Sequence, residues 1–153
     1  MATFCPYTGG DVIYPVCAEC EDKICKMSSD VFACIIAGSR TFDDYAQMKE
    51  RMDFLLQDKS DVMIISGGAK GADTLAEKYA SESSKCTRLI VMKADWDLYG
   101  KSAGFIRNEK MHKSAAHFND RGCVLFWDGT SKGTKQNISL ARKYSTPLKI
   151  VKF

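Results

Sequence analysis

The sequence lacks both the long hydrophobic runs of a membrane protein and the charge excess of a dedicated nucleic-acid binder. No stretch approaches the roughly 18 consecutive apolar residues that a bilayer-spanning helix needs. The 22 lysines and arginines outnumber the 19 aspartates and glutamates only slightly and are spread along the chain, whereas nucleic-acid binders cluster their basic residues. We therefore expect no membrane partner and a slight preference for anionic ligands.

Two fingerprints of common nucleotide-binding enzymes are also missing. The Gly-x-Gly-x-x-Gly spacing of dinucleotide-binding proteins does not follow the first predicted strand. No phosphate loop with the four-residue spacing between its first glycine and Gly-Lys-Ser or Gly-Lys-Thr is present either. These absences argue against ordinary dehydrogenases and P-loop NTPases, so we expect no nicotinamide cofactor.

Disulfides are not expected, although the chain holds seven cysteines. The start of the chain has no basic region followed by an apolar one, as an export signal would have. We therefore expect a cytoplasmic protein, in which thiols stay reduced or bind metal. Three of the cysteines fall in or near predicted strands and are expected to be inert core thiols: Cys34, Cys86 and Cys123.

The first 30 residues differ from the rest and are predicted to form a separate Cys-rich segment. They contain enough thiolates for a tetrahedral structural zinc, supplied by Cys5, Cys17, Cys20 and Cys25. The run that begins at Cys5 resembles a zinc-ribbon knuckle in which Thr8 takes the place of a second cysteine. A segment with so little apolar content needs a metal to fold alone. The alternative is that these four cysteines are free thiols. The role of the Cys-rich segment stays open among docking, dimer formation and a lid.

Residues 31–153 alternate between short apolar runs and amphipathic segments. The apolar runs predict strands at 31–37, 62–65, 89–92, 123–127 and 148–151. The amphipathic segments predict helices from Asp43 or Asp44 to about 58, over 72–80, after Gly104 to 115, and over 134–144, with a long loop through Trp96 and Tyr99. This order predicts an α/β, Rossmann-like, doubly wound parallel sheet of about five strands.

The loops that follow the predicted strands are rich in glycine. In a doubly wound sheet these loops meet at the carboxyl edge of the strands, where ligands bind. Glycine allows a close approach of the backbone, and helix N-termini attract phosphate; the alternative is that these are ordinary tight turns. The candidate ligand-binding residues are Gly38, Ser39, Arg40, Ser66, Gly67, Gly68, Gly71, Asp73, Gly104, Arg107, Asn108, Gly129, Ser131, Gly133 and Thr134.

Three charged residues in these loops have more than one possible role. Arg40 and Arg107 can hold a phosphate in a bidentate manner or form surface ion pairs. Asp73 can interact with a helix N-terminus, accept hydrogen bonds from ribose hydroxyls, or hold Arg40 or Lys70. The sequence leaves these roles open.

Four ordered motifs together resemble the SLOG superfamily, in particular its YspA/YpsA-related branch. They are Gly38-Ser39-Arg40, the loop from Ser66 to Asp73, the segment from Ala103 to Met111, and Ser131-x-Gly133-Thr134. The resemblance covers about residues 31 to 153. It implies a Rossmann-like fold that binds nucleotides or their derivatives, as in the LOG phosphoribohydrolases and the DNA-processing protein A.

The resemblance also marks a difference from the phosphoribohydrolases. Their catalytic glutamate lies three residues after the loop threonine, and the corresponding position here is Asn137. An amide cannot accept a proton as a carboxylate does. His112 and His117 lie too far apart around a helix to pair on a metal, and Asp95 and Asp97 are expected to be solvated loop carboxylates, with an acid/base pair as the alternative.

Three functions remain open after these observations. The leading hypothesis is a non-catalytic module that senses or sequesters a nucleotide-derived ligand, such as an ADP-ribose-like molecule or a cyclic nucleotide, in signalling, antiviral defence or its evasion. The alternative is hydrolysis of an N-glycosidic or phosphoester bond. The third is single-stranded nucleic-acid binding, with Trp96, Tyr99 and Phe105 as stacking platforms. A homo-oligomer is expected.

Overall fold

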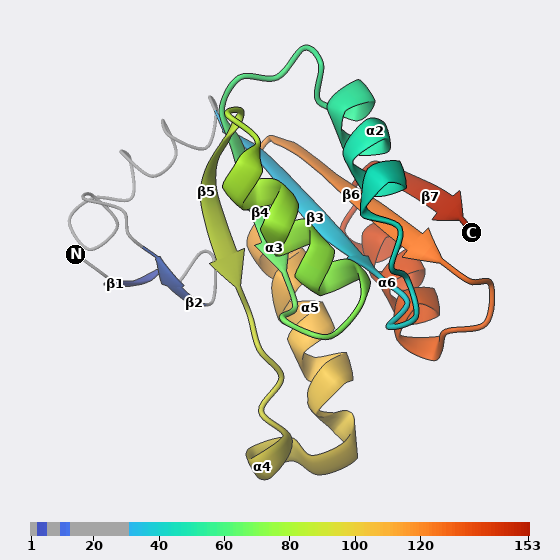
Figure 1. Cartoon of the computed structure of the whole chain (residues 1–153). Helices are drawn as coiled ribbons and strands as arrows, with labels where there is room; N and C mark the ends of the chain where they lie inside the picture. The colour runs from blue at the N-terminus through green and yellow to red at the C-terminus, as the bar shows by residue number, and fades with distance from the viewer. Residues whose placement is uncertain (1–2, 6–9, 13–30) are drawn as a thin grey trace.

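The fold is described from a computed structural model that covers residues 3–5, 10–12 and 31–153, with only the backbone in the first two segments (Figure 1). Those two segments are the strands β1 (Thr3–Cys5) and β2 (Gly10–Val12), which pair antiparallel. The remaining strands are β3 (Phe32–Gly38), β4 (Val62–Ser66), β5 (Cys86–Val91), β6 (Asp120–Trp127) and β7 (Leu148–Lys152). They form one parallel sheet in the order β5-β4-β3-β6-β7.

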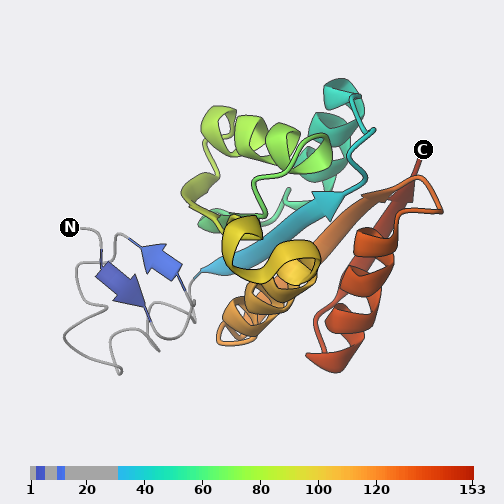
Figure 2. The ribbon, with the colours of Figure 1, turned by 90° about the horizontal axis from the view of Figure 1, so that it is seen from below.

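Helices cover both faces of this sheet, as Figure 2 shows. The helices are α2 (Tyr45–Leu55), α3 (Ala72–Glu82), α4 (Trp96–Tyr99), a 3-10 helix η1 (Gly100–Ser102), α5 (Ala103–Ala115) and α6 (Lys132–Lys143). Helices α2 and α3 pack on one face, and α5 and α6 pack on the other. The chain therefore winds outward in both directions from β3.

The sequence of β3 explains why this strand lies at the centre. Its side chains are apolar in succession rather than in alternation, which is typical of a strand buried on both faces. Cys34 and Ile36 join the core beneath α2 and α3, and Ala33 and Ile35 join the core beneath α5 and α6. The two layers of helices thus pack against opposite faces of the same short strand, β3.

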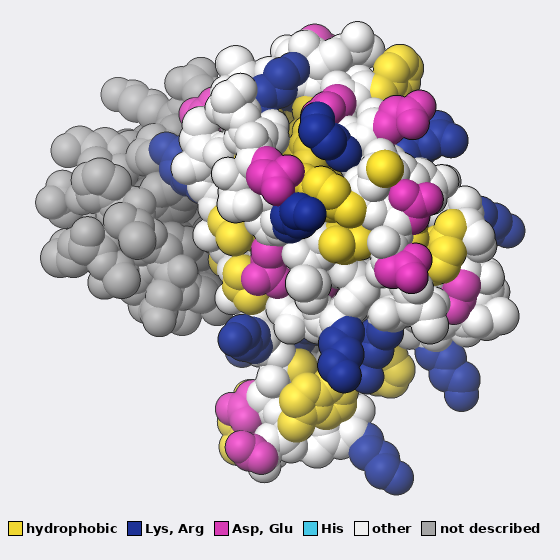
Figure 3. Space-filling view, in the orientation of Figure 1, with side chains coloured by type: hydrophobic (Ala, Val, Ile, Leu, Met, Phe, Trp, Pro, Cys, Tyr) yellow, Lys and Arg dark blue, Asp and Glu magenta, His cyan; other side chains and the backbone are white. Residues whose placement is uncertain are grey.

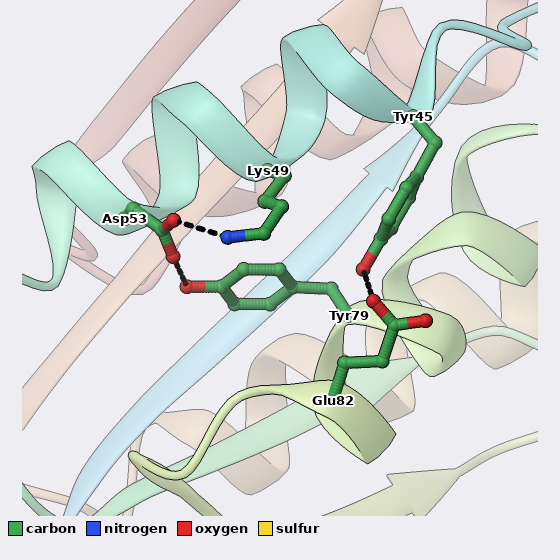
Figure 4. A network of polar contacts seen from close by, with 5 residues as sticks. All are labelled: Tyr45, Lys49, Asp53, Tyr79 and Glu82. Carbon is green, nitrogen blue, oxygen red and sulfur yellow. Dashed lines mark hydrogen bonds and ion pairs between the residues drawn. The ribbon is translucent and has the colours of Figure 1, made fainter.

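Polar contacts join α2 and α3 at their exposed side (Figure 4). The Tyr79 hydroxyl donates to Asp53 Oδ1 at 2.8 Å, and Lys49 Nζ donates to Asp53 Oδ2 at 2.8 Å. The Tyr45 hydroxyl donates to Glu82 Oε1 at 2.8 Å. This network lies on the helices that flank the sheet, away from the loops that form the site described below.

The order of strands and helices confirms the fold predicted for residues 31–153. The segment predicted as a long loop is different, because it contains α4 and η1, and Asp95 caps α4 by accepting from the amide of Leu98 at 3.1 Å. Strand β5 begins at Cys86, three residues before its predicted start, and α5 and α6 begin slightly earlier than predicted.

The predicted zinc site cannot be followed in the structure. Cys17, Cys20 and Cys25 lie outside the described residues, and Cys5 is described only by its backbone in β1. Among the side chains that are described, no group of three or more His, Cys, Asp and Glu residues could hold a metal ion. No helix within the described ranges is long and apolar enough to cross a membrane.

The loops after β3 and β4 approach each other closely at Gly71, which precedes α3. Gly71 has φ 78° and ψ −123°, a backbone conformation that residues with a Cβ rarely adopt. A Cβ at this position would lie 2.5 Å from the carbonyl oxygens of Ser39 and Arg40. Glycine is therefore needed here for its backbone conformation and also for the space that it leaves.

Gly100 provides a matched control, because it has nearly the same backbone conformation, φ 58° and ψ −135°, with nothing within 4 Å of its Cβ position. We expect Gly71→Ala to lower the free energy of unfolding by at least about 2 kcal/mol more than Gly100→Ala, because only the former adds a backbone clash to the strain. Urea denaturation measures both. Equal losses would show that the close approach of the loops has no energetic weight.

Candidate functional site

A pocket of about 380 Å³ lies at the carboxyl ends of β3 and β6, where the strand order reverses. We call it the main pocket. Its walls come from the loops after β3, β4 and β6 and from the first turns of α5 and α6. They consist of Ala37, Gly38, Ser39, Arg40, Thr41, Ala69, Asp73, Trp96, Lys101, Gly104, Phe105, Arg107, Asn108, Met111, Asp128, Ser131, Gly133, Thr134 and Asn137.

Ser39 ties the loops after β3 and β6 together at the base of the main pocket. Its amide donates to the Phe126 carbonyl at 2.8 Å, and its hydroxyl accepts from the Asp128 amide at 3.1 Å. Asp128 Oδ1 accepts from the amides of Thr130 and Ser131 at 2.8 and 2.9 Å. These backbone donors lower the pKa of Asp128 below its usual value. The loop is thereby fixed in place before a ligand arrives.

The first turn of α6 faces the main pocket and favours an anion there. Ser131 caps the helix, with its hydroxyl accepting from the Thr134 amide at 3.5 Å and the Thr134 hydroxyl at 3.1 Å. The only atom near a Cβ built at Gly133 would be Asn108 Nδ2, 4.0 Å away. This open space lets a phosphate approach the positive end of the helix.

Arg107 is the most enclosed cation of the site. It projects from α5 and donates through Nη1 to the carbonyl of Gly67. Gly67 must be glycine for this arrangement, because a Cβ there would lie 2.5 Å from Arg107 Nη1 and 2.8 Å from Asp73 Oδ2. The guanidinium and the carboxylate thus lie on either side of one glycine.

Asp73 is a buried carboxyl with an unused oxygen. Only 5% of its surface is exposed, and Oδ2 accepts from the Ala69 amide at 3.2 Å. Oδ1 has no hydrogen-bond partner among the described residues. Burial raises the pKa of Asp73 to about 6, against the opposing effect of the Arg107 guanidinium. Because Oδ1 is buried, leaving it unpaired costs stability.

A chain of side-chain amides holds Arg107 from the other side. Arg107 Nε donates to Asn108 Oδ1 at 2.8 Å, and Asn108 Nδ2 donates to Gln136 Oε1 at 3.0 Å. Gln136 Nε2 then donates to the carbonyl of Phe105 at 3.1 Å. The chain crosses from α5 to α6 and back, so the position of Arg107 depends on the packing of these two helices.

Asn137 lines the main pocket and pairs with the buried His112. His112 Nε2 lies 3.1 Å from Asn137 Oδ1. Burial lowers the pKa of His112 to about 4, so the ring is neutral at pH 7. A neutral ring with its proton on Nε2 donates to Oδ1 and leaves the amide nitrogen of Asn137 as a donor at the pocket wall. In this tautomer the pocket wall at Asn137 offers a hydrogen-bond donor.

Two exposed aromatic side chains line the main pocket: Trp96 is 49% exposed and Phe105 is 47% exposed. Tyr99, at the end of α4, is 42% exposed and does not line the pocket. The Arg40 guanidinium carbon lies 6.0 Å from the centre of the Trp96 ring. Figure 3 shows Lys and Arg side chains gathered where the projecting α4 segment meets the body, next to hydrophobic side chains of that segment. A planar base could stack at this border and find positive charge beside it.

The structure brings most of the predicted site residues together. Twelve of the fifteen line the main pocket or an adjoining pocket to which Gly67 and Gly68 belong. The other three line neither pocket: Ser66 is buried with its hydroxyl donating to the Asp73 carbonyl at 3.1 Å, Gly71 lies behind the loop after β3, and Gly129 is exposed. Their roles are in shaping the loops.

Some pocket residues were missed by the sequence reasoning. Asp128 comes directly after β6, and Lys93 comes two residues after the end of β5, so their place beside a strand end is a signal that could have included them. Lys101 lies in η1, inside a segment expected to be a loop, and it gave no signal. The three described cysteines are free, and burial raises the pKa of Cys34 to about 12 and that of Cys123 well above its usual value, as expected of inert core thiols.

The raised pKa of Asp73 predicts a specific pH dependence of stability. Between pH 4 and 6 the folded state binds more protons at Asp73 than the unfolded state, so ionising this group lowers stability as the pH rises. Asp73→Asn should therefore gain stability relative to the wild type over this range, by up to about 3 kcal/mol. His112 is present in both proteins and cancels from the difference.

Chemical denaturation of the two proteins at pH 4, 5, 6 and 7 measures this difference. Asp128→Asn is the control with the opposite sign, because the pKa of Asp128 is lowered and its ionised form stabilises the fold. A difference between Asp73→Asn and the wild type that stays constant with pH would mean that Asp73 ionises freely in the folded protein.

Among solved structures, the chain is similar to DNA processing protein A from Helicobacter pylori, described for its single-stranded DNA binding mode. The match has a TM-score of 0.57 at 19% sequence identity, and it covers 85% of this chain and 68% of that one. At this identity the likeness concerns the fold.

Sequence comparisons give a closer relationship. The family model described as the YspA, cpYpsA-related SLOG family matches residues 33–99. The chain is also 31% identical to the Gene 61 protein of Mycobacterium phage D29 over 119 residues, which covers 74% of this chain and 91% of the phage protein. The glycine-rich loops after β3 and β4, which hold Arg40 and Asp73 at the main pocket, lie inside the matched region, and the chain belongs to the YspA-related SLOG family.

Proposed function

We propose that this protein binds a nucleotide or nucleotide-derived small molecule in the main pocket. The observation that carries the proposal is the pairing of a half-buried Arg107 with the open N-terminus of α6 on two walls of one pocket. Both groups favour phosphate. The volume of about 380 Å³ lies in the lower part of the range for small-molecule sites.

Each part of such a ligand has a complementary wall. The phosphate lies between Arg107 and the amide of Gly133 at the open N-terminus of α6. A sugar hydroxyl lies against the pocket wall at Asp73, and Asn137 donates to a base carbonyl or a further phosphate oxygen. The base stacks at the aromatic border formed by Trp96 and Phe105.

Binding without hydrolysis is the function that we favour. Asn137 pairs with His112 at the position of the phosphoribohydrolase glutamate, and it has no carboxylate with which to accept a proton. Hydrolysis is the alternative, with Asp73 as the acid or base, since its pKa of about 6 suits proton transfer near neutral pH. Arg107 would then stabilise the developing negative charge.

Single-stranded DNA binding is the second candidate. It is favoured by the exposed rings of Trp96 and Tyr99 beside basic side chains, and by the DNA-binding mode named for the Helicobacter pylori protein of the same fold. Bases stack on such rings with little sequence preference.

The predicted zinc site of the Cys-rich segment and the expected homo-oligomer stay predictions from the sequence.

Variants of Arg107 test the main proposal by calorimetry with nucleoside monophosphates. Arg107→Ala should weaken binding at least tenfold, because it removes a charged hydrogen-bond donor from a partly desolvated pocket. Gly67→Ala should weaken binding as well, because it displaces the guanidinium and keeps its charge. Arg142→Ala, on the exposed last turn of α6, is the matched control.

Unchanged affinity in both Arg107→Ala and Gly67→Ala would place the ligand elsewhere. Chromatography of the same nucleotides, of cyclic nucleotides and of ADP-ribose after incubation with the protein separates binding from hydrolysis. If the wild type forms a hydrolysis product and Asp73→Asn does not, the protein is a hydrolase and the proposal of binding without hydrolysis is wrong.

A short oligonucleotide tests the second candidate. If single-stranded DNA binds at the aromatic border, Trp96→Ala should weaken its binding about tenfold, because stacking on one ring contributes about 1–3 kcal/mol per base. Binding should also weaken steeply with added salt. Phe54→Ala, an exposed aromatic on α2, serves as the control. Salt-independent binding, or equal effects of the two variants, would remove this candidate.

A further inference from the structure

A second pocket, of about 370 Å³, adjoins the main pocket on the side of β4 and β5. We call it the side pocket. It is formed by the loops after β3, β4 and β5 together with α4 and α5. Its lining residues are Arg40, Gly67, Gly68, Ala69, Lys70, Lys93, Ala94, Trp96 and Arg107.

The two pockets share a wall. Arg40, Ala69, Trp96 and Arg107 line both of them. Within this wall the Arg40 guanidinium carbon lies 6.0 Å from the centre of the Trp96 ring. A ligand that leaves the main pocket across this wall passes two guanidinium groups and an exposed indole, and then enters the side pocket.

The charges of the two pockets differ. The side pocket is lined by four cations, from Arg40, Lys70, Lys93 and Arg107, and by no carboxylate. The main pocket also contains Asp73 and Asp128 and several uncharged hydrogen-bonding groups. Apart from the Trp96 ring in the shared wall, the side pocket therefore has the composition of an anion site.

Its lysines are available to a ligand, whereas the backbone amides of Gly68 and Ala69 are already bonded. The Gly68 amide donates to Ser66 Oγ at 3.3 Å, and the Ala69 amide donates to Asp73 Oδ2 at 3.2 Å. Within the described part of the chain, Lys70 and Lys93 take part in none of the ion pairs. The stem of Lys93 packs over Gly68, since a Cβ at Gly68 would lie 3.0 Å from Lys93 Cγ.

We infer that the side pocket binds a second phosphate, so that the ligand carries at least two phosphate groups, one in each pocket. This inference rests on the proposed function and narrows it to nucleotides longer than a monophosphate. The second phosphate can belong to a diphosphate bridge, as in ADP-ribose, or to the next nucleotide of a dinucleotide. Both offer the same charge to Lys70 and Lys93.

Calorimetry on the whole chain tests this inference with five ligands. Two are monophosphates, AMP and GMP, and three carry two phosphate groups, ADP-ribose and the dinucleotides pApA and pGpG. The wild type should bind at least one of the two-phosphate ligands about tenfold or more tightly than the monophosphate. The preference between ADP-ribose and the dinucleotides identifies the source of the second phosphate.

The variant for the side pocket is Lys70→Gln with Lys93→Gln. In this double variant the affinity for the two-phosphate ligand should fall about tenfold, so that the ligand no longer binds more tightly than the monophosphate. The affinity for the monophosphate should change less than twofold. Lys113→Gln with Lys149→Gln is the matched control, because it removes the same charge from exposed positions that line neither the main nor the side pocket. This control variant should retain the full difference between ligands. Thermal denaturation checks that both double variants are folded.

Two results would overturn the inference. One is equal affinity of the wild type for monophosphate and two-phosphate ligands. The other is an equal loss for all ligands in the side-pocket variant, which would mean that the lysines attract anions without forming a separate site. If the monophosphate binds and depends on Arg107, the proposed function stands and only the second phosphate is refuted. If no nucleotide binds, both fail.

Discussion

The site depends on the position of the backbone after β3, which is held between two other loops. The Ser39 amide and hydroxyl bond to the chain at the end of β6, and the carbonyl oxygens of Ser39 and Arg40 lie against Gly71 at the start of α3. Three strand ends are thereby fixed within one small region. This constraint brings Arg40, Asp73 and Asp128 into the wall of a single pocket.

Burial of charge gives that pocket its chemical character. Arg107 and Asp73 are close to each other across Gly67, yet the desolvated carboxyl keeps one oxygen unpaired and a pKa of about 6. Leaving such a group without a partner costs stability in the free protein. This buried arrangement differs from the solvent-exposed ion pair of Lys49 and Asp53 on α2.

Asn137 presents an amide at the wall of the main pocket. Its side chain lies at the pocket wall, as a catalytic residue would, but its oxygen pairs with a neutral His112. An ionised glutamate there would place a negative charge beside a buried ring and near the proposed phosphate. The amide instead supplies a donor, which suits a protein that holds an anion.

The sequence by itself determined the order of strands and helices and the set of glycine-rich loops. These features depend on local periodicity and on residues next to each strand end, as in β3 and its Gly38-Ser39-Arg40 loop. Only the tertiary structure decided that α4 projects beside the pocket, that Asp73 keeps an unpaired oxygen, that His112 pairs with Asn137, and that Lys93 and Lys70 meet in a second pocket. The reason is physical: burial and pairing depend on distances between side chains far apart in the chain, and those distances are set only when the helices pack on the sheet.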